Sequence, residues 1–139
     1  MYSKILLAAD GSEHSRRAAE HAIMLTNGKL HTQIEIVYVV DPNKVKSDVL
    51  ESWNAPDIGD KRRLRLREIE QIMRESGVSY KITFLQGEPG PTIVNFANKN
   101  KFDLVIIGSR GLNVLQEFVL GSVSHKVAKR ANCPVLIVK

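Results

Sequence analysis

Short apolar runs alternate along this chain with longer segments whose apolar residues recur at helical spacing. Runs that are apolar or rich in β-branched residues cover 4–9 (KILLAA), 34–40 (IEIVYVV), 103–107 (DLVII) and 134–139 (PVLIVK). Such runs are typical of strands, and the continuous run 4–9 is typical of a strand buried on both faces of a sheet. Residues 79–85 (SYKITFL) alternate instead, as a half-buried strand does. The pattern therefore predicts five strands.

Four segments between these runs have the spacing and the end signals of amphipathic helices. The first begins after Ser12, a residue suited to cap a helix, and ends at Asn27-Gly28. We expect the others from about residue 59 to residue 75 with Gly77 as the stop, after the turn Gly87 to Pro91, and from about Ser122. The polar stretch 43–58 and the segment 108–121 are expected to be loops.

Strict alternation of strands and helices predicts one α/β domain over residues 1–139, a doubly wound parallel sheet with helices on both faces. The residues leave two common strand orders open, 3-2-1-4-5 and 2-1-3-4-5. In the first order, strands 1 and 4 are neighbours, and ligands bind beyond the carboxyl ends of the strands where the chain changes direction. Ala8, Ala9, Asp10 and the run from Gly108 to Gly111 would lie there.

Composition narrows the protein class and the compartment. The chain has 139 residues, of which 43% are hydrophobic and 25% charged, as in an ordinary soluble domain. It has no apolar run near the ~20 residues that a membrane helix needs, and its N-terminus lacks the features of a signal peptide. Cys133 is the one cysteine, which excludes an internal disulfide. We therefore expect a cytoplasmic protein with no membrane partner.

The positive charge of the chain is local. The formal net charge is +5, and the run KRRLRLR at 61–67 contributes five positive and no negative charges, so the remainder is neutral. This patch suits an anionic partner such as RNA or a membrane surface, or it is a solvated helix face. Because it has no interleaved aromatic residue for base stacking, the helix face is favoured and nucleic acid is not expected. The role of Trp53, in the polar stretch, stays open.

The segment GSRGLNVLQEFVLGSVS, residues 108–124, carries the candidate chemistry. Gly121 and Ser122 open a helix, where the N–H groups of Ser122, Val123 and Ser124 lack helical partners and the helix dipole attracts anions. Glycine at position 121 would let phosphate oxygens reach these groups, and the two serine hydroxyls would add donors. Arg110 either pairs with phosphate or points to solvent.

A plain strand–loop–helix connection is the alternative. The loop 108–121 has fourteen residues, which is long for such a connection, and it is too apolar for disorder. Phosphate binding is therefore favoured. Asp10 is either a ribose or metal–phosphate contact or a turn residue. The four histidines show no metal spacing and are expected at the surface, with His125 the one that faces the predicted phosphate site.

Three segments resemble the universal stress protein family: AADGSEHS, DLVIIGSRG and GSVSHKVAKRANCPVLIVK. The spacing Gly108-x2-Gly111-x9-Gly121-Ser122 is similar to the pattern G-x2-G-x9-G-S/T of those members that bind ATP. The resemblance covers nearly the whole chain, although many members have Pro or Val where this chain has Ala8. It implies a Rossmann-like fold of the adenine nucleotide alpha hydrolase type with strand order 3-2-1-4-5, and a homodimer through the last strand, Val135 to Val138.

The resemblance also implies a role for each site residue. Ala8 and Ala9 would lie beside the adenine or ribose, Asp10 near the ribose and phosphates, and Ile107 against the base, while Val39 would offer backbone hydrogen bonds to the adenine edge. The ribose and phosphates would be wrapped by Gly108, Ser109, Arg110 and Gly111, and the phosphate chain held by Gly121, Ser122, Val123 and Ser124.

These observations predict a nucleotide-dependent regulatory or stress-response protein with little or no turnover. The P-loop pattern G-x4-G-K-S/T is absent, and no Ser-His-Asp arrangement or pair of catalytic carboxylates is evident. ATP, or ADP or AMP, would bring Mg²⁺ or Mn²⁺ bound through the phosphates. The alternatives are a slow ATP hydrolase and a nucleotide-independent dimeric interaction module, and a protein partner of unknown identity is possible in each case.

Overall fold

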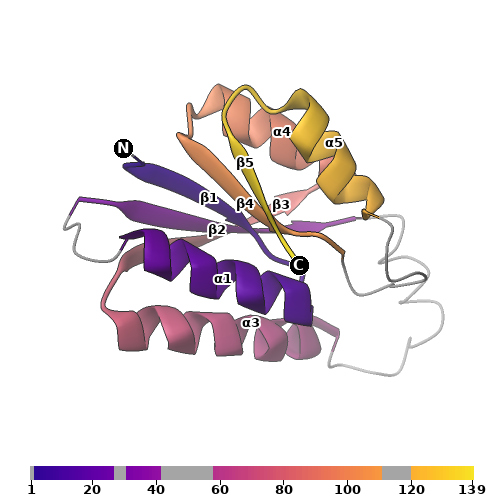
Figure 1. Cartoon of the computed structure of the whole chain (residues 1–139). Coiled ribbons are helices and arrows are strands. Elements are labelled where there is room, and N and C mark those ends of the chain that lie inside the picture. Colours follow the sequence, from indigo (N-terminus) through magenta and orange to yellow (C-terminus); the bar gives the residue numbers. More distant parts are fainter. Residues whose placement is uncertain (1, 27–30, 42–57, 111–119) are drawn as a thin grey trace.

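The chain forms a parallel sheet between two layers of helices (Figure 1). The computed structural model describes residues 2–26, 31–41, 58–110 and 120–139. Within them the sheet has five strands in the order β3-β2-β1-β4-β5, which confirms the order 3-2-1-4-5 and excludes 2-1-3-4-5. The strands are β1 (Lys4–Ala8), β2 (Gln33–Val40), β3 (Ser79–Gln86), β4 (Leu104–Gly108) and β5 (Val135–Val138).

The helices divide between the two faces of the sheet according to the direction of the chain. From β1 the chain steps outward through β2 to β3, and α1 (Glu13–Thr26) and α3 (Ile58–Ser76) cover one face (Figure 1). It then returns to β4 and continues to β5, and α4 (Pro89–Lys99) and α5 (Ser122–Arg130) cover the other. Right-handed crossovers produce this division, because reversing the direction of travel moves the connecting helix to the opposite face.

A separate hydrophobic cluster fills each side of the sheet. In β1, Ile5 and Leu7 belong to the cluster beneath α1 and α3, while Leu6 and Ala8 belong to the cluster beneath α4 and α5. All four are 6% exposed or less. A central strand that is buried on both faces cannot alternate with polar residues, which explains the continuous apolar run. By contrast, β3 is an edge strand whose exposure alternates, as predicted.

Helix ends agree with the capping signals, with one difference. The Ser12 hydroxyl accepts a hydrogen bond from the N–H of Ser15 at 3.2 Å and so caps α1. Gly77, with φ of 75°, follows the end of α3. The prediction that the third helix follows Pro91 was wrong, because α4 begins at Pro89 and contains both prolines. Proline is tolerated in a first turn because the N–H that it lacks would have no helical partner there.

Several predictions fall on residues that the structure does not describe or describes in part. Asn27-Gly28, the stretch 43–57 with Trp53, and residues 111–119 lie outside the described residues. The basic run 61–67 lies within α3, where Leu66 is buried and Arg67 is exposed. The other basic side chains of the run lie outside the described residues, so the solvated helix face stays a prediction. No helix of the described part is long and apolar enough to cross a membrane.

Candidate functional site

The carboxyl ends of the central strands bring the predicted site residues to one edge of the sheet. Ala8, the last residue of β1, pairs with Val37 of β2 on one side and with Ile107 of β4 on the other. The N–H of Ala9 then donates to Val37 O at 3.0 Å. The residues that follow these pairs, Asp10 and Gly108 among them, therefore emerge side by side where the strand order changes direction.

The apolar residues predicted for the base and ribose are largely committed to packing. Ala8, Ala9 and Ile107 are each 6% exposed. The side chain of Ala9 belongs to the cluster beneath α1, and those of Ala8 and Ile107 belong to the cluster beneath α4. Val39 is half-buried near the end of β2. Because these side chains pack in the core, the four residues can offer a ligand mainly their backbone N–H and C=O groups.

The amino end of α5 lies at this edge, and no side chain of the described residues caps it. Gly121 is its N-cap residue, with φ −59° and ψ 150°, and it makes no side-chain cap hydrogen bond. The first turn holds no acidic residue. Among the described residues, none accepts a hydrogen bond from the N–H of Ser122, Val123 or Ser124; the ladder begins with His125 N to Gly121 O at 2.9 Å. Three donors and the positive end of the helix dipole therefore lie together without an acceptor among the described residues.

Two other helices that begin at this edge, α1 and α4, offer less to an anion. In α1, Ser12 caps the first turn and Glu13 adds a negative charge there. In α4, no side chain caps the first turn, but Pro89 and Pro91 carry no N–H. Anion binding by a helix needs several free N–H groups, so α5 suits it better than α1 or α4 does.

The Ser124 hydroxyl differs from its predicted role. It donates to Gly108 O at 2.5 Å, and the side chain is 3% exposed. This hydrogen bond joins the first turn of α5 to the end of β4. The hydroxyl proton is therefore not available to a phosphate in this geometry. Ser122 is exposed, and the role of its hydroxyl stays a prediction. The backbone N–H of Ser124 is unaffected.

Ser109 joins the elements that surround the edge. Its N–H donates to Val138 O of β5 at 2.7 Å, and its carbonyl accepts from the N–H of Gly121 at 2.8 Å. Its hydroxyl oxygen lies 3.3 Å from Nδ1 of His14 in α1. Ser109 therefore joins the end of β4 to the start of α5.

His14 is the site-edge residue that the sequence prediction missed. It was expected at the surface, but it is 8% exposed and lies against the end of β4. A Cβ built at Gly108 would lie 2.7 Å from the Cβ of His14 and 3.0 Å from its carbonyl carbon. Glycine at position 108 thus allows α1 to approach, in addition to the predicted approach of a ligand. The signal was present, because His14 is four residues before Ala18 and shares the buried stripe of α1.

The remaining predicted residues are placed less completely. Asp10 is half-buried, and its Oδ1 accepts the N–H of Ser12 at 2.8 Å, so it has the turn role whether or not it meets a ligand. Arg110 is half-buried at the same edge. Gly111 lies outside the described residues. His21, His31 and His125 are exposed, as expected.

No group of three or more His, Cys, Asp or Glu side chains within the described ranges could hold a metal ion. Asp10 supplies the one carboxylate of the predicted site. Such an arrangement fits a divalent cation that arrives with a phosphate ligand and keeps most of its waters.

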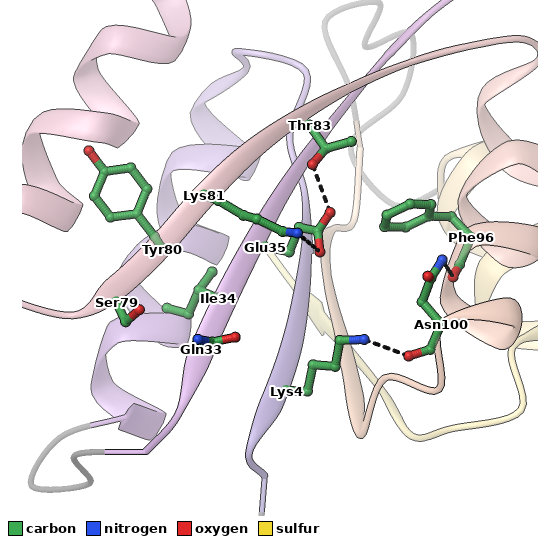
Figure 2. Close-up of a pocket in the computed structure, with 10 residues that line it drawn as sticks. All are labelled: Lys4, Gln33, Ile34, Glu35, Ser79, Tyr80, Lys81, Thr83, Phe96 and Asn100. Atoms are coloured by element: carbon green, nitrogen blue, oxygen red, sulfur yellow. Dashed lines mark hydrogen bonds and ion pairs between the residues drawn. The ribbon is translucent and has the colours of Figure 1, made fainter.

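A cavity of about 390 Å³ lies at the other end of the sheet (Figure 2). Its lining includes Lys4, Gln33 and Ser79, the first residues of β1, β2 and β3, so it opens near the amino ends of the strands and away from the predicted site. Glu35, 7% exposed, accepts a hydrogen bond from the Thr83 hydroxyl at 2.7 Å and lies 3.5 Å from the Lys81 ammonium. Figure 2 shows this satisfied polar cluster, which needs no ligand to complete it.

Comparisons with known proteins agree with the geometry. The sequence model of the Universal stress protein family matches residues 1–139. Universal stress protein MJ0531 of Methanocaldococcus jannaschii is similar, with 35% identity over 100% of this chain and 83% of that protein. Among solved structures, hypothetical protein MJ0577 of the same organism has a TM-score of 0.85 and 30% identity over 100% of this chain and 96% of that chain. A universal stress protein in complex with cAMP has a TM-score of 0.70 and 25% identity over 99% of this chain and 97% of that chain.

Proposed function

The chain belongs to the universal stress protein family, and from that membership we propose that it binds an adenine nucleotide, ATP above all, as a regulatory stress-response module. The observation that carries the proposal is the uncapped amino end of α5. It presents the N–H groups of Ser122, Val123 and Ser124 at the switch point of the sheet, without an acidic residue in the first turn. Such an end attracts phosphate.

The proposed ligand extends from α5 across the ends of β4, β1 and β2. The phosphates meet the turn of α5, the ribose lies between Asp10 and the Gly108–Arg110 stretch, and the base lies on Ile107 and near the backbone of Val39. The similar universal stress protein that was solved in complex with cAMP supports an adenine nucleotide as the ligand class. Mg²⁺ or Mn²⁺ accompanies ATP, bound through its phosphates. The Asp10 carboxylate lies at the same edge of the sheet and contacts water molecules of the metal ion.

We propose holding and sensing of the nucleotide in preference to turnover. Phosphoryl transfer needs a positioned nucleophile and cations on the transferring group. The sequence has no lysine in a G-x4-G-K-S/T motif to supply the second requirement. Single-turnover hydrolysis of bound ATP by the wild type and by a Gly121→Val variant tests this point. A measurable rate that the substitution abolishes would establish the slow hydrolase instead.

The proposed protein is a homodimer that pairs through β5. This strand is an edge of the sheet, and its described residues Val135, Leu136 and Ile137 are only half-buried. Pairing of two such edges satisfies backbone groups that a lone edge leaves to solvent. An ATP-rich compartment such as the cytoplasm is the setting that this function requires.

Nucleotide extraction tests the proposal directly. The purified protein is denatured, and the released small molecules are identified by mass. The stripped protein is then melted with ATP, ADP, AMP and GTP in turn. A ligand at 100 times its dissociation constant adds about 2.7 kcal/mol to the free energy of unfolding, so ATP is expected to raise the melting temperature measurably and GTP to raise it less. No adenine nucleotide in the extract and no shift with any of the four would favour the nucleotide-independent interaction module.

A further inference from the structure

His14 lies in the first turn of α1, on the buried stripe of that helix, although its imidazole is polar. Its side chain is 8% exposed, and its Cβ lies where a side chain at position 108 would otherwise project. Burial of a polar side chain requires a hydrogen-bond partner, and the structure gives one: Nδ1 of His14 lies 3.3 Å from Oγ of Ser109.

The contact matters because the other polar groups of Ser109 are already engaged. Its N–H donates to Val138 O and its carbonyl accepts from Gly121 N. The hydroxyl is therefore the group with which Ser109 can meet a ligand, and His14 is its neighbour. A hydroxyl has one proton and two lone pairs, so whatever orients the proton decides whether Ser109 offers a ligand a donor or only lone pairs.

A neutral imidazole carries its proton on one nitrogen or the other. If Nδ1 lacks the proton, it draws the hydroxyl proton of Ser109 toward α1 and leaves lone pairs facing the site, where they would repel a phosphate oxygen. If Nδ1 carries the proton, it donates to Ser109 Oγ, and the hydroxyl proton turns toward the site. Only the second arrangement favours an anionic or ribose oxygen.

We propose that His14 is a positioning residue of the nucleotide site: it donates from Nδ1 to Ser109 and so directs the Ser109 hydroxyl proton to an oxygen of the bound nucleotide. The inference rests on the proposed nucleotide binding and adds a residue that contacts no nucleotide itself. It also explains why α1 packs so closely on β4, since the imidazole must reach the loop that follows Gly108.

Two variants of His14 separate the hydrogen bond from the packing. His14→Asn places an amide nitrogen near the position of Nδ1 and keeps a donor. His14→Leu fills a similar volume without a donor. Ser109→Ala removes the hydroxyl itself, and His21→Leu changes an exposed histidine of α1, the helix that carries His14, as a matched control. Melting temperatures without nucleotide establish that each variant is folded.

Calorimetric titration with ATP gives the decisive numbers. We expect His14→Leu and Ser109→Ala each to weaken binding about tenfold, as the loss of one hydrogen bond to a charged group does. The double variant should bind no more weakly than either single one, because both remove the same interaction. His14→Asn should stay within about threefold of wild type, and His21→Leu should bind ATP as tightly as wild type does. Additive effects, or equal losses for the Asn and Leu variants, overturn the proposal.

The imidazole ¹⁵N resonances of the wild type give a second readout that needs no variant. They distinguish a protonated from an unprotonated Nδ1, and an unprotonated Nδ1 in the nucleotide-bound protein overturns the inference even if His14→Leu fails to fold. If His14→Leu binds ATP as tightly as wild type does, this inference alone is contradicted. A wild type that binds no nucleotide contradicts the proposed function, and this inference falls with it.

Discussion

At Gly108 the first turn of α1 approaches the end of β4 so closely that no side chain fits between them. The atoms that a Cβ would meet at 2.7 to 3.2 Å include the carbonyl carbon and oxygen of His14, which are backbone and cannot rotate away. At Gly90 the nearest atom is Lys126 Cδ at 2.9 Å, which belongs to a flexible side chain. Two glycines with similar gaps therefore differ in what a substitution would displace.

Gly108→Ala is expected to lower the free energy of unfolding by about 1–3 kcal/mol, the usual cost of overpacking a core. Gly90→Ala should stay within about 1 kcal/mol of wild type, because Lys126 can move and alanine favours the helix. Denaturant titration of both variants measures the difference. An equal loss at the two positions would show that the close approach at Gly108 is not rigid.

Asp103 holds the amino end of β1 against the start of β4. Its Oδ2 accepts hydrogen bonds from the Ser3 hydroxyl at 2.8 Å, from the N–H of Ser3 at 3.0 Å and from the N–H of Lys4 at 2.9 Å. These bonds hold the pKa of the Asp103 carboxyl below its usual value, and the bond from the Ser3 hydroxyl contributes most. A depressed folded pKa contributes stability above the unfolded value, about 3.9, and loses it as the pH falls through the folded value.

Asp103→Asn should therefore be less stable than wild type by about 1 kcal/mol at pH 7, and the gap should close as the pH falls below about 4. Urea titrations between pH 2.5 and 7 measure it, with exposed Glu20→Gln as the control. A gap that stays constant with pH would mean that the charge of Asp103 contributes nothing.

The elements themselves were largely predictable from the sequence, because each burial pattern has a local cause. The doubly buried β1 reads as a continuous apolar run, and the edge strand β3 alternates. The contacts between elements were not predictable in the same way. That His14 reaches Ser109, 95 residues further along the chain, depends on the packing of α1 on β4. A serine at position 124 is compatible with a hydroxyl that donates to a phosphate or to Gly108 O. The sequence does not distinguish the two partners, because the packing of α5 on β4 determines which one lies within reach.

The buried cluster on β2 and β3 gives a prediction at the scale of the sheet. Thr83→Val removes the hydroxyl that donates to the carboxylate of Glu35, and an unsatisfied buried group costs about 1–3 kcal/mol. Lys81→Ala removes an ammonium that is 71% exposed and 3.5 Å away, and such a pair is worth at most about 1 kcal/mol. Chemical denaturation should therefore show the larger loss for Thr83→Val, and the reverse order would contradict the assigned roles.

Strand order and assembly are properties of the whole molecule, and local sequence patterns do not determine them. The residues alone allowed two orders, and the family resemblance selected the one that the sheet has. Assembly remains a prediction. Pro134 O and Val138 O face β4, where they accept from Val105 N and Ser109 N. Because strand residues alternate, the backbone groups of Val135 and Ile137 face the open edge.

Ile137→Pro removes an outward N–H without touching the β4 ladder, whereas Ile137→Ala keeps it. We expect wild type and Ile137→Ala to sediment at twice the 15.6 kDa of one chain and Ile137→Pro to sediment as the folded monomer. Dimers of the proline variant would show that pairing does not run through this edge.

The most direct test of the central claim is the affinity for ATP when one N–H of the α5 turn is removed. Ser122 is the first residue of α5, and proline is well tolerated at the first position of a helix. The preceding residue, Gly121, has a ψ of 150°, which is the extended conformation that a following proline requires. Calorimetry should find that Ser122→Pro binds ATP at least about tenfold more weakly than wild type at an unchanged melting temperature. Ser122→Ala, which removes the hydroxyl but keeps the N–H, should bind ATP at least about tenfold more tightly than Ser122→Pro does. Wild-type affinity in Ser122→Pro would contradict phosphate binding at this helix end.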